Sequence, residues 1–112
     1  MRFKEFVEAK WKNCCFGVGY LCEKMLKGGY LEHYQILAFV DNDKKKWGEC
    51  ISGKSVQEPI IGLNLDYDKV LIAIMDYCEI KKQLINDFGI NENKIMCIKD
   101  VFDEIKNKKL NR

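Results

Sequence analysis

The fold of this chain is decided by residues 14–22, which read CCFGVGYLC. Residues 13–16 form a compact apolar run that is too short for a helix and therefore predicts a buried strand. Two glycines follow at positions 17 and 19. Residues 20–27 then carry apolar side chains at helical spacing, and a Gly-Gly pair ends that pattern. This stretch predicts a strand, a tight glycine turn and a helix.

The alternation of strand and helix continues along the rest of the chain. Apolar runs predict further strands at residues 35–40, 54–56, 69–74 and 95–98, and helical spacing predicts helices at residues 3–11, 77–88 and 101–108. Solidly apolar strands that alternate with helices are typical of a parallel sheet covered on both faces. The length and this alternation predict a single α/β domain over residues 1–112. Because crossovers between parallel strands are right-handed, few orders of the strands are possible. We predict a three-layer, Rossmann-like domain with about five mostly parallel strands in the order 3-2-1-4-5.

Length, composition and charge exclude several classes of protein. The chain has 112 residues, which is room for one ordinary domain, and 47% hydrophobic residues supply a core. A formal net charge of +2 is too small for a dedicated nucleic-acid binder. No segment approaches the roughly 18 consecutive apolar residues of a membrane span. We expect neither nucleic acid nor a membrane span.

Cysteine usage indicates a reducing compartment. Nothing in the first residues resembles a secretory signal, and the six cysteines include no C-x-x-C pair. With a single histidine in the chain, the ligands of a structural zinc site are missing. We therefore expect a cytoplasmic location, no metal, and cysteines that pack as small hydrophobic side chains.

The glycine turn matches the first two glycines of the G-x-G-x-x-G motif, between a strand and a helix. Gly17 allows the tight turn, and Gly19 lets a pyrophosphate approach the backbone and the helix N-terminus. Cys22 replaces the third glycine, which weakens the match. Asp41 stands 22 residues after Gly19, where an acid accepts hydrogen bonds from a ribose. A carboxylate there favours NAD over NADP, because a 2′-phosphate would be repelled.

The predicted ligand contacts lie at or just after the carboxyl ends of three strands, and these ends meet at one edge of the sheet. They are Phe16, Gly17, Val18, Gly19, Tyr20, Leu21, Asp41, Asn42, Ala73, Ile74 and Met75. The alternative interpretation is that the glycines only make a tight crossover and that Asp41 only begins a polar turn. Lysines 44–46 could reach a phosphate, although such a run is commonly solvent-facing.

No catalytic residue is predicted. Two Y-x-x-x-K pairs, at residues 20–24 and 77–81, have the spacing by which sugar epimerases activate a tyrosine. Tyr20 opens the first helix, and Tyr77 follows the fourth predicted strand with no catalytic Ser or Thr segment before it, so helix capping and packing are the better explanation. Two D-x-D stretches, at residues 41–43 and 66–68, are likewise better explained as turns than as metal ligands.

Five stretches together carry a family resemblance: CCFGVGYLCEKML, ILAFVDNDKKKWG, ISGKSV, DKVLIAI and YCEIKKQLINDFGI. They resemble the Rossmann-like domains of bacterial surface-polysaccharide proteins. These include the leading domain of nucleotide-sugar dehydratases and epimerases, and domains attached to sugar-modifying acyltransferases and methyltransferases. The resemblance implies a bound nucleotide, commonly NAD or a nucleotide-sugar, at Gly17, Gly19 and Asp41.

Two functions of different classes follow. The first is a nucleotide-binding module in polysaccharide biosynthesis that lacks complete catalytic machinery, so that turnover requires a second copy or a glycan-biosynthesis enzyme as partner. The second is an interaction or regulatory subunit with a vestigial nucleotide site. It would dock on a larger enzyme through Phe3, Phe6, Trp11, Phe102 and Ile105.

Overall fold

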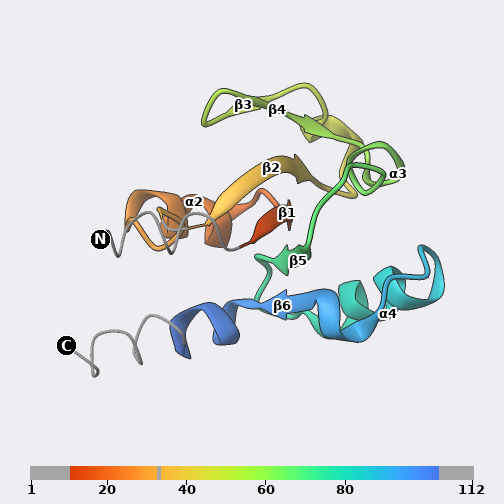
Figure 1. Ribbon diagram of the computed structural model, residues 1–112. Coiled ribbons are helices and arrows are strands. Elements are labelled where there is room, and N and C mark those ends of the chain that lie inside the picture. Colours follow the sequence, from red (N-terminus) through yellow and green to blue (C-terminus); the bar gives the residue numbers. More distant parts are fainter. Residues whose placement is uncertain (1–10, 33, 104–112) are drawn as a thin grey trace.

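The computed structural model describes residues 11–32 and 34–103, which form one six-stranded sheet in the order β3-β4-β2-β1-β5-β6 (Figure 1). The strands are β1 Lys12–Phe16, β2 Gln35–Val40, β3 Cys50–Ile51, β4 Lys54–Gln57, β5 Lys69–Ile72 and β6 Ile95–Cys97. Parallel pairing joins β4 to β2, β2 to β1, β1 to β5 and β5 to β6. Strand β3 pairs with β4 in the antiparallel sense and forms one edge.

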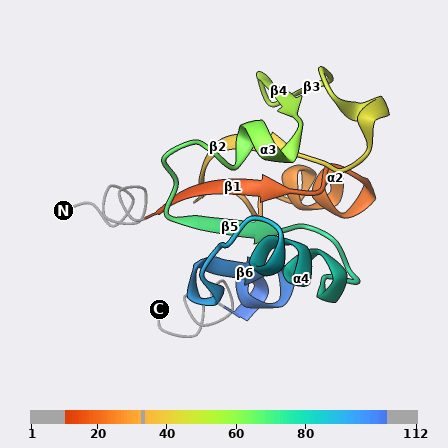
Figure 2. The same ribbon diagram turned by 90° about the vertical axis from the view of Figure 1, so that its right-hand side faces the viewer.

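Helices cover both faces of the sheet. They are α2 Tyr20–Lys27, α3 Pro59–Gly62 and α4 Cys78–Asn86, with single 3-10 turns η1 Lys44–Lys46 and η2 Glu92–Lys94. A last helix begins at residue 98 and is described as far as residue 103. Helix α2 lies on one side of the strands, whereas α3 and α4 lie on the other side, in front of the sheet in Figure 2. This arrangement confirms the predicted three-layer, Rossmann-like architecture.

The core is divided between the two faces because neighbouring side chains of a strand point in opposite directions. In β1, Cys15 packs with Met25 of α2 on one face, and Cys14 packs with Leu84 of α4 on the other. Cys14, Cys15 and Cys22 are at most 1% exposed. For these three cysteines, the prediction of a packing role is confirmed, whereas it is wrong for Cys50 and Cys78, which are exposed.

The five predicted strands occur in the predicted order, and the sequence analysis missed the two-residue edge strand β3. Its turn, Ser52 and Gly53, has φ values of 51° and 80°, which is the conformation of a tight hairpin. The short helix α3 was also missed. It begins on a proline, whose fixed φ suits the first turn of a helix.

Several predicted boundaries were wrong by one or two residues. Strand β5 ends at Ile72 and not at residue 74, because its neighbour β1 turns away after Phe16 and offers no further partner. Strand β6 ends one residue early, because the last helix begins at residue 98 and not at 101. The Asp100 carboxylate accepts a 2.9 Å hydrogen bond from the Cys97 amide and so caps the start of this helix. Helix α4 spans residues 78–86 where 77–88 was predicted; its C-terminal turn closes with bonds from the amides of residues 89 and 90.

Two strands are longer than predicted, and two predicted helices extend beyond the described residues. Strand β1 begins one residue early, at Lys12, and β4 extends to Gln57. Residues 3–10 of the helix predicted at residues 3–11, and residues 104–108 of the last helix, lie outside the described residues, and residue 11 is not helical. Within residues 11–32 and 34–103, no helix has the length and apolar character needed to cross a membrane.

Candidate functional site

The carboxyl ends of β1, β2 and β5 bring the three predicted ligand-contact segments together. Directly after β1, the Gly17 amide donates a 2.8 Å hydrogen bond to the carbonyl of Val40, the last residue of β2. On the other side, the Ala73 amide donates a 2.9 Å bond to the Phe16 carbonyl. These bonds fix the loops at the edge of the sheet where ligands of open α/β sheets bind.

Gly17 occupies a position that only glycine fits. Its φ is +104°, a conformation that costs a side chain with a Cβ atom. A Cβ atom built on Gly17 would lie 2.5 Å from Cγ1 and 2.9 Å from Cδ1 of Ile74. Ile74 therefore packs beneath the turn, so its side chain supports the loop.

The N-terminus of helix α2 is open toward the same edge. Gly19 is its N-cap residue, without a side-chain hydrogen bond to the helix, and the first helical bond runs from the Glu23 amide to the Gly19 carbonyl. The amides of residues 20–22 are therefore left without an acceptor inside the helix. A helix N-terminus of this kind attracts anions through its amides and its dipole.

A lysine lies directly over this helix terminus. The ammonium nitrogen of Lys46, in η1, is 3.5 Å from the position that a Cβ atom on Gly19 would take. Lys46 is half-buried, whereas Lys44 and Lys45 are exposed. One lysine of the run therefore faces the glycine turn, and the other two face solvent. The ammonium and the α2 amides together favour a phosphate group above Gly19.

Asp41 fastens the glycine turn to the loop after β2. One carboxylate oxygen accepts a 2.9 Å hydrogen bond from the Val18 amide, and the other accepts a 2.8 Å bond from the Asp43 amide. Its carbonyl oxygen accepts a 2.7 Å bond from the Trp47 indole. Each carboxylate oxygen keeps a second lone pair that could accept a hydrogen bond from a ribose hydroxyl. Ribose recognition by Asp41 stays a prediction.

The other predicted contact residues differ in how they could meet a ligand. Phe16 and Ala73 are buried, so they present only backbone to the edge. Leu21 is half-buried and packs against the core on the α2 face. Tyr20 and Met75 are 73% and 75% exposed at the rim. Tyr20 is also in cation–π range of the Lys24 ammonium, which lies 5.4 Å from the ring centre.

Asn42 is joined to a residue that the sequence analysis missed. Its side-chain amide exchanges two hydrogen bonds, of 2.9 and 3.0 Å, with that of Gln83 on α4. No local motif signals this partner, because 41 residues separate the two positions. Lys46, by contrast, belongs to the lysine run at residues 44–46 that the sequence analysis considered for contact with a phosphate.

Cys22 fills the position of the third glycine beneath the turn. Its thiol is hydrogen-bonded to that of Cys15, which lowers the pKa of Cys22 and raises that of Cys15. Burial and the Asp41 carboxylate oppose the lowering at Cys22, whereas the Lys46 ammonium assists it. Because Cys22 is only 1% exposed, its thiol packs α2 onto β1 and is not available to a substrate.

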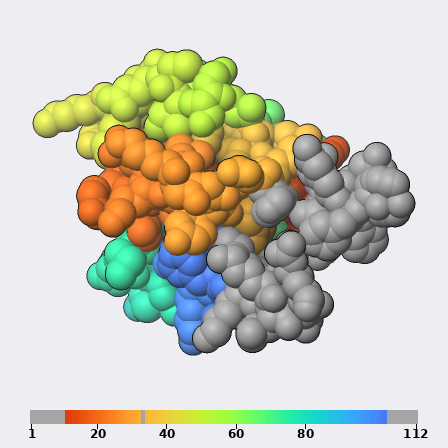
Figure 3. All heavy atoms as spheres, turned by 90° about the vertical axis from the view of Figure 1, so that its left-hand side faces the viewer, coloured from red at the N-terminus to blue at the C-terminus, as the bar shows by residue number. Residues whose placement is uncertain are grey.

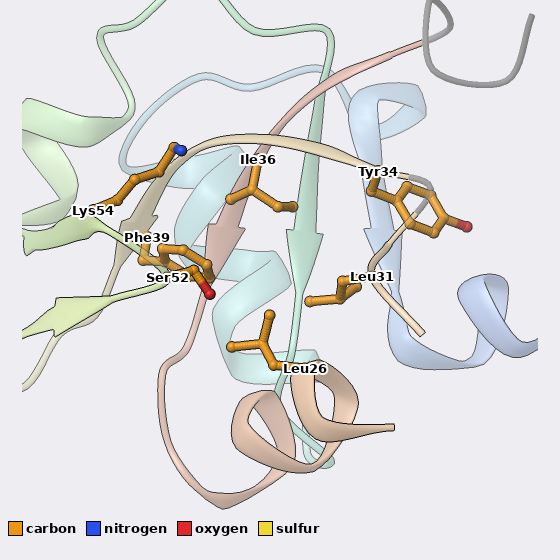
Figure 4. A pocket seen from close by; sticks show the side chains of 7 residues that line it. All are labelled: Leu26, Leu31, Tyr34, Ile36, Phe39, Ser52 and Lys54. Atoms are coloured by element: carbon orange, nitrogen blue, oxygen red, sulfur yellow. The ribbon is translucent and has the colours of Figure 1, made fainter. Parts of the chain in front are cut away.

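A separate pocket lies between α2, β2 and the β3–β4 hairpin, on the face shown in Figure 3. Its volume is about 220 Å³, and its lining consists of Leu26, Leu31, Tyr34, Ile36, Phe39, Ser52 and Lys54 (Figure 4). None of the predicted ligand contacts lines it. Across residues 11–32 and 34–103 there is also no group of three or more His, Cys, Asp or Glu side chains arranged to hold a metal.

Comparison with known proteins gives a family and a fold. A protein-family model described as C2185-like, N-terminal, matches residues 10–96. The crystal structure of RSP, a Rex-family repressor, has a TM-score of 0.57 at 12% identity; the match covers 88% of this chain and 58% of RSP. The chain therefore spans little more than half of RSP.

A second solved structure covers a larger share of the neighbouring protein. UDP-D-quinovosamine 4-dehydrogenase from Vibrio fischeri has a TM-score of 0.55 at 22% identity, over 87% of this chain and 84% of the dehydrogenase. No curated protein sequence matches the chain. At these identities the two structures show a shared fold of the Rossmann-like α/β type.

Proposed function

This chain belongs to the C2185-like N-terminal family, and we propose that it is a nucleotide-binding module of cell-surface polysaccharide biosynthesis. Its ligand is a dinucleotide, NAD above all, or a nucleotide-sugar. The diphosphate binds at the open N-terminus of α2, and a ribose binds beside Asp41. The description of the family names no ligand, so the proposal stands on the site.

One observation carries this proposal: an uncapped helix terminus, a glycine and a lysine ammonium meet at one point. The amides at the start of α2 lack acceptors, and the Lys46 ammonium is 3.5 Å from the Cβ position of Gly19. Two independent sources of positive potential thus face the same small volume, and the missing Cβ leaves that volume open. A diphosphate supplies the matching charge.

Asp41 supports a ligand with a free ribose. Its carboxylate lies on the loop beside the glycine turn, within one hydrogen bond of Val18. A 2′-phosphate placed there would meet this negative charge, so we expect NAD to bind more tightly than NADP. The dehydrogenase of a UDP-sugar among the structural neighbours is the reason to keep nucleotide-sugars beside NAD.

Catalysis, in this proposal, is supplied by a second copy or by a glycan-biosynthesis enzyme that the module joins. The exposed side chains Tyr20 and Met75 at the rim of the site offer apolar contact for the remainder of the substrate or for that partner. If the module forms part of an enzyme, the resemblance favours a nucleotide-sugar epimerase or dehydratase, or a sugar-modifying transferase.

The proposal is tested by calorimetric titration with NAD, NADP, coenzyme A and a UDP-sugar. Lys46→Ala should weaken binding of the best ligand about tenfold, which corresponds to about 1.4 kcal/mol. Lys45→Ala removes the same charge from the neighbouring exposed position and should leave the affinity nearly unchanged. Absence of binding across the panel, or equal losses for the two variants, would refute a diphosphate site at α2.

A second candidate function is favoured by the contacts of Asp41. Because its carboxylate already takes the Val18 amide, part of the glycine turn is occupied by a group of the protein itself. Ile60 and Ile61 on α3 are also 59% and 56% exposed, which is unusual for adjacent apolar residues. A regulatory subunit with a vestigial site predicts no response to the ligand panel and co-purification with a larger glycan enzyme.

A further inference from the structure

A pair of side-chain amides bridges two distant parts of the candidate site. The amide of Asn42, directly after Asp41, donates to the Gln83 carbonyl oxygen at 2.9 Å, and the Gln83 amide donates back to Asn42 at 3.0 Å. Asn42 is exposed and Gln83 is half-buried on α4. The two hydrogen bonds therefore tie the loop after β2 to the opposite helical layer at a place open to solvent.

The position of this pair follows from the proposed diphosphate and ribose contacts. A nucleotide whose phosphates lie over Gly19 and whose ribose lies beside Asp41 carries its base beyond Asp41. Asn42 is the residue next to Asp41 in the chain, and its partner is Gln83 on α4. Both amides are thus placed to meet the edge of a base.

The amide pair has the hydrogen-bonding pattern that a base can replace. Each amide presents a carbonyl acceptor next to an N–H donor, and in the pair both groups are satisfied by the other amide. Exposed hydrogen bonds of this kind exchange readily with other partners, because water competes for the same groups and their net contribution to stability is small. A ligand that satisfies both amides at once can displace them from each other at little cost.

We propose that Asn42 and Gln83 separate on ligand binding and read adenine from two sides. The adenine amino group has two hydrogens, one beside the acceptor N1 and one beside the acceptor N7. Each amide can therefore accept from the amino group and donate to a ring nitrogen, the bidentate pairing that Asn and Gln make with adenine. This inference rests on the proposed function and narrows its ligand to an adenine nucleotide.

Other bases leave one of the amides incompletely paired. Uracil and hypoxanthine have no amino group, and each offers a single ring N–H donor beside its carbonyl oxygen. The carbonyl of one of the two amides would therefore lose its partner. Cytosine has an amino group but a ring acceptor on only one side of it. A bidentate amide contact is worth about 5- to 150-fold in discrimination between bases.

The test compares nucleoside diphosphates that differ only in their base, with inorganic pyrophosphate as the ligand that has no base. ADP, IDP, UDP and inorganic pyrophosphate are titrated calorimetrically into the full chain and into Gln83→Leu, Asn42→Leu and Asn86→Leu. Asn86 lies on the same helix and is exposed, so Asn86→Leu is the matched control. We expect the full chain to bind ADP at least about fivefold more tightly than IDP or UDP. Gln83→Leu and Asn42→Leu should lose that preference, whereas Asn86→Leu keeps it.

A second readout separates base recognition from a purely structural link. In the ¹⁵N-labelled chain, the side-chain amide signals of Asn42 and Gln83 should shift with ADP and stay in place with pyrophosphate. If all nucleotides bind equally, or if both Leu variants weaken every ligand alike, the pair only fastens α4 and the inference is wrong while the diphosphate site stands. If no ligand binds, not even pyrophosphate, the proposed function fails first and the inference falls with it.

Discussion

Replacement of Gly17 by alanine tests the central support of the candidate site. The residue holds φ at +104°, and its Cβ position lies 2.5 Å from Cγ1 of Ile74 and 3.3 Å from the Ala73 carbonyl oxygen. We expect about 1 to 2 kcal/mol from the unfavourable backbone conformation. The steric overlap in a packed region adds about 1 to 3 kcal/mol.

The expected loss for Gly17→Ala is therefore about 2 to 5 kcal/mol, a large share of the 5 to 15 kcal/mol by which domains of this kind are stable. Urea unfolding followed by circular dichroism measures it. With a slope of about 1.5 kcal/mol per molar urea, the midpoint should fall by about 1.3 to 3.3 M.

Three further variants identify the cause of this loss: Ile74→Ala, the double variant and Gly19→Ala. In Gly17→Ala with Ile74→Ala, the overlapping side-chain atoms are gone, so a double-mutant cycle should show a favourable coupling of about 1 to 3 kcal/mol. Gly19→Ala is the matched control: its φ is −87°, and its Cβ would meet only the Lys46 ammonium, at 3.5 Å. We expect its stability to change by less than about 1 kcal/mol. A Gly17→Ala protein as stable as the parent, or an absence of coupling to Ile74, would refute this account of the turn.

The remaining predictions concern the acid and the cysteines. Asp41→Ala leaves two loop amides without their acceptor, and we expect a loss of about 1 to 3 kcal/mol in urea unfolding; an unchanged midpoint would show that the carboxylate does not hold the turn. Burial raises the pKa of Cys14 from 9.0 to about 12. Its thiol is therefore more readily ionised in the unfolded chain, and stability that is present below pH 9 should fall as the pH rises above it. The loss at pH 10.5 is about 2 kcal/mol, and Cys14→Ala should show a correspondingly smaller alkaline loss in thermal unfolding. Iodoacetamide should label the exposed Cys50 and Cys78 under native conditions, with mass spectrometry as the readout, and early labelling of Cys14 would contradict its burial.

The order of the strands could be predicted because the sequence repeats one unit, a strand followed by a helix. Right-handed crossovers between parallel strands allow few arrangements of this unit. Solid apolar runs at residues 35–40 and 69–74 indicated strands buried on both faces, and right-handed crossovers then placed β1 in the centre. Local signals also located the glycine turn and Asp41. The structure joins the two through the hydrogen bond from the Val18 amide.

Short elements were harder to predict because their stability comes from partners and not from their own residues. Strand β3 has two residues and exists through its pairing with β4, so no hydrophobic period marks it. The end of β5 was likewise set by the end of β1, a neighbour whose boundary is invisible in the sequence of β5 itself.

The sequence by itself determined the fold class, the position of the glycine turn and the need for a small residue at Gly17, since these follow from local patterns and from backbone geometry. The tertiary structure decided which distant groups meet at that turn. It placed the Lys46 ammonium over Gly19, Ile74 beneath Gly17, and Gln83 against Asn42. Contacts of this kind depend on how η1 and α4 pack on the sheet. Such packing is a property of the whole core, and no short stretch of sequence encodes it.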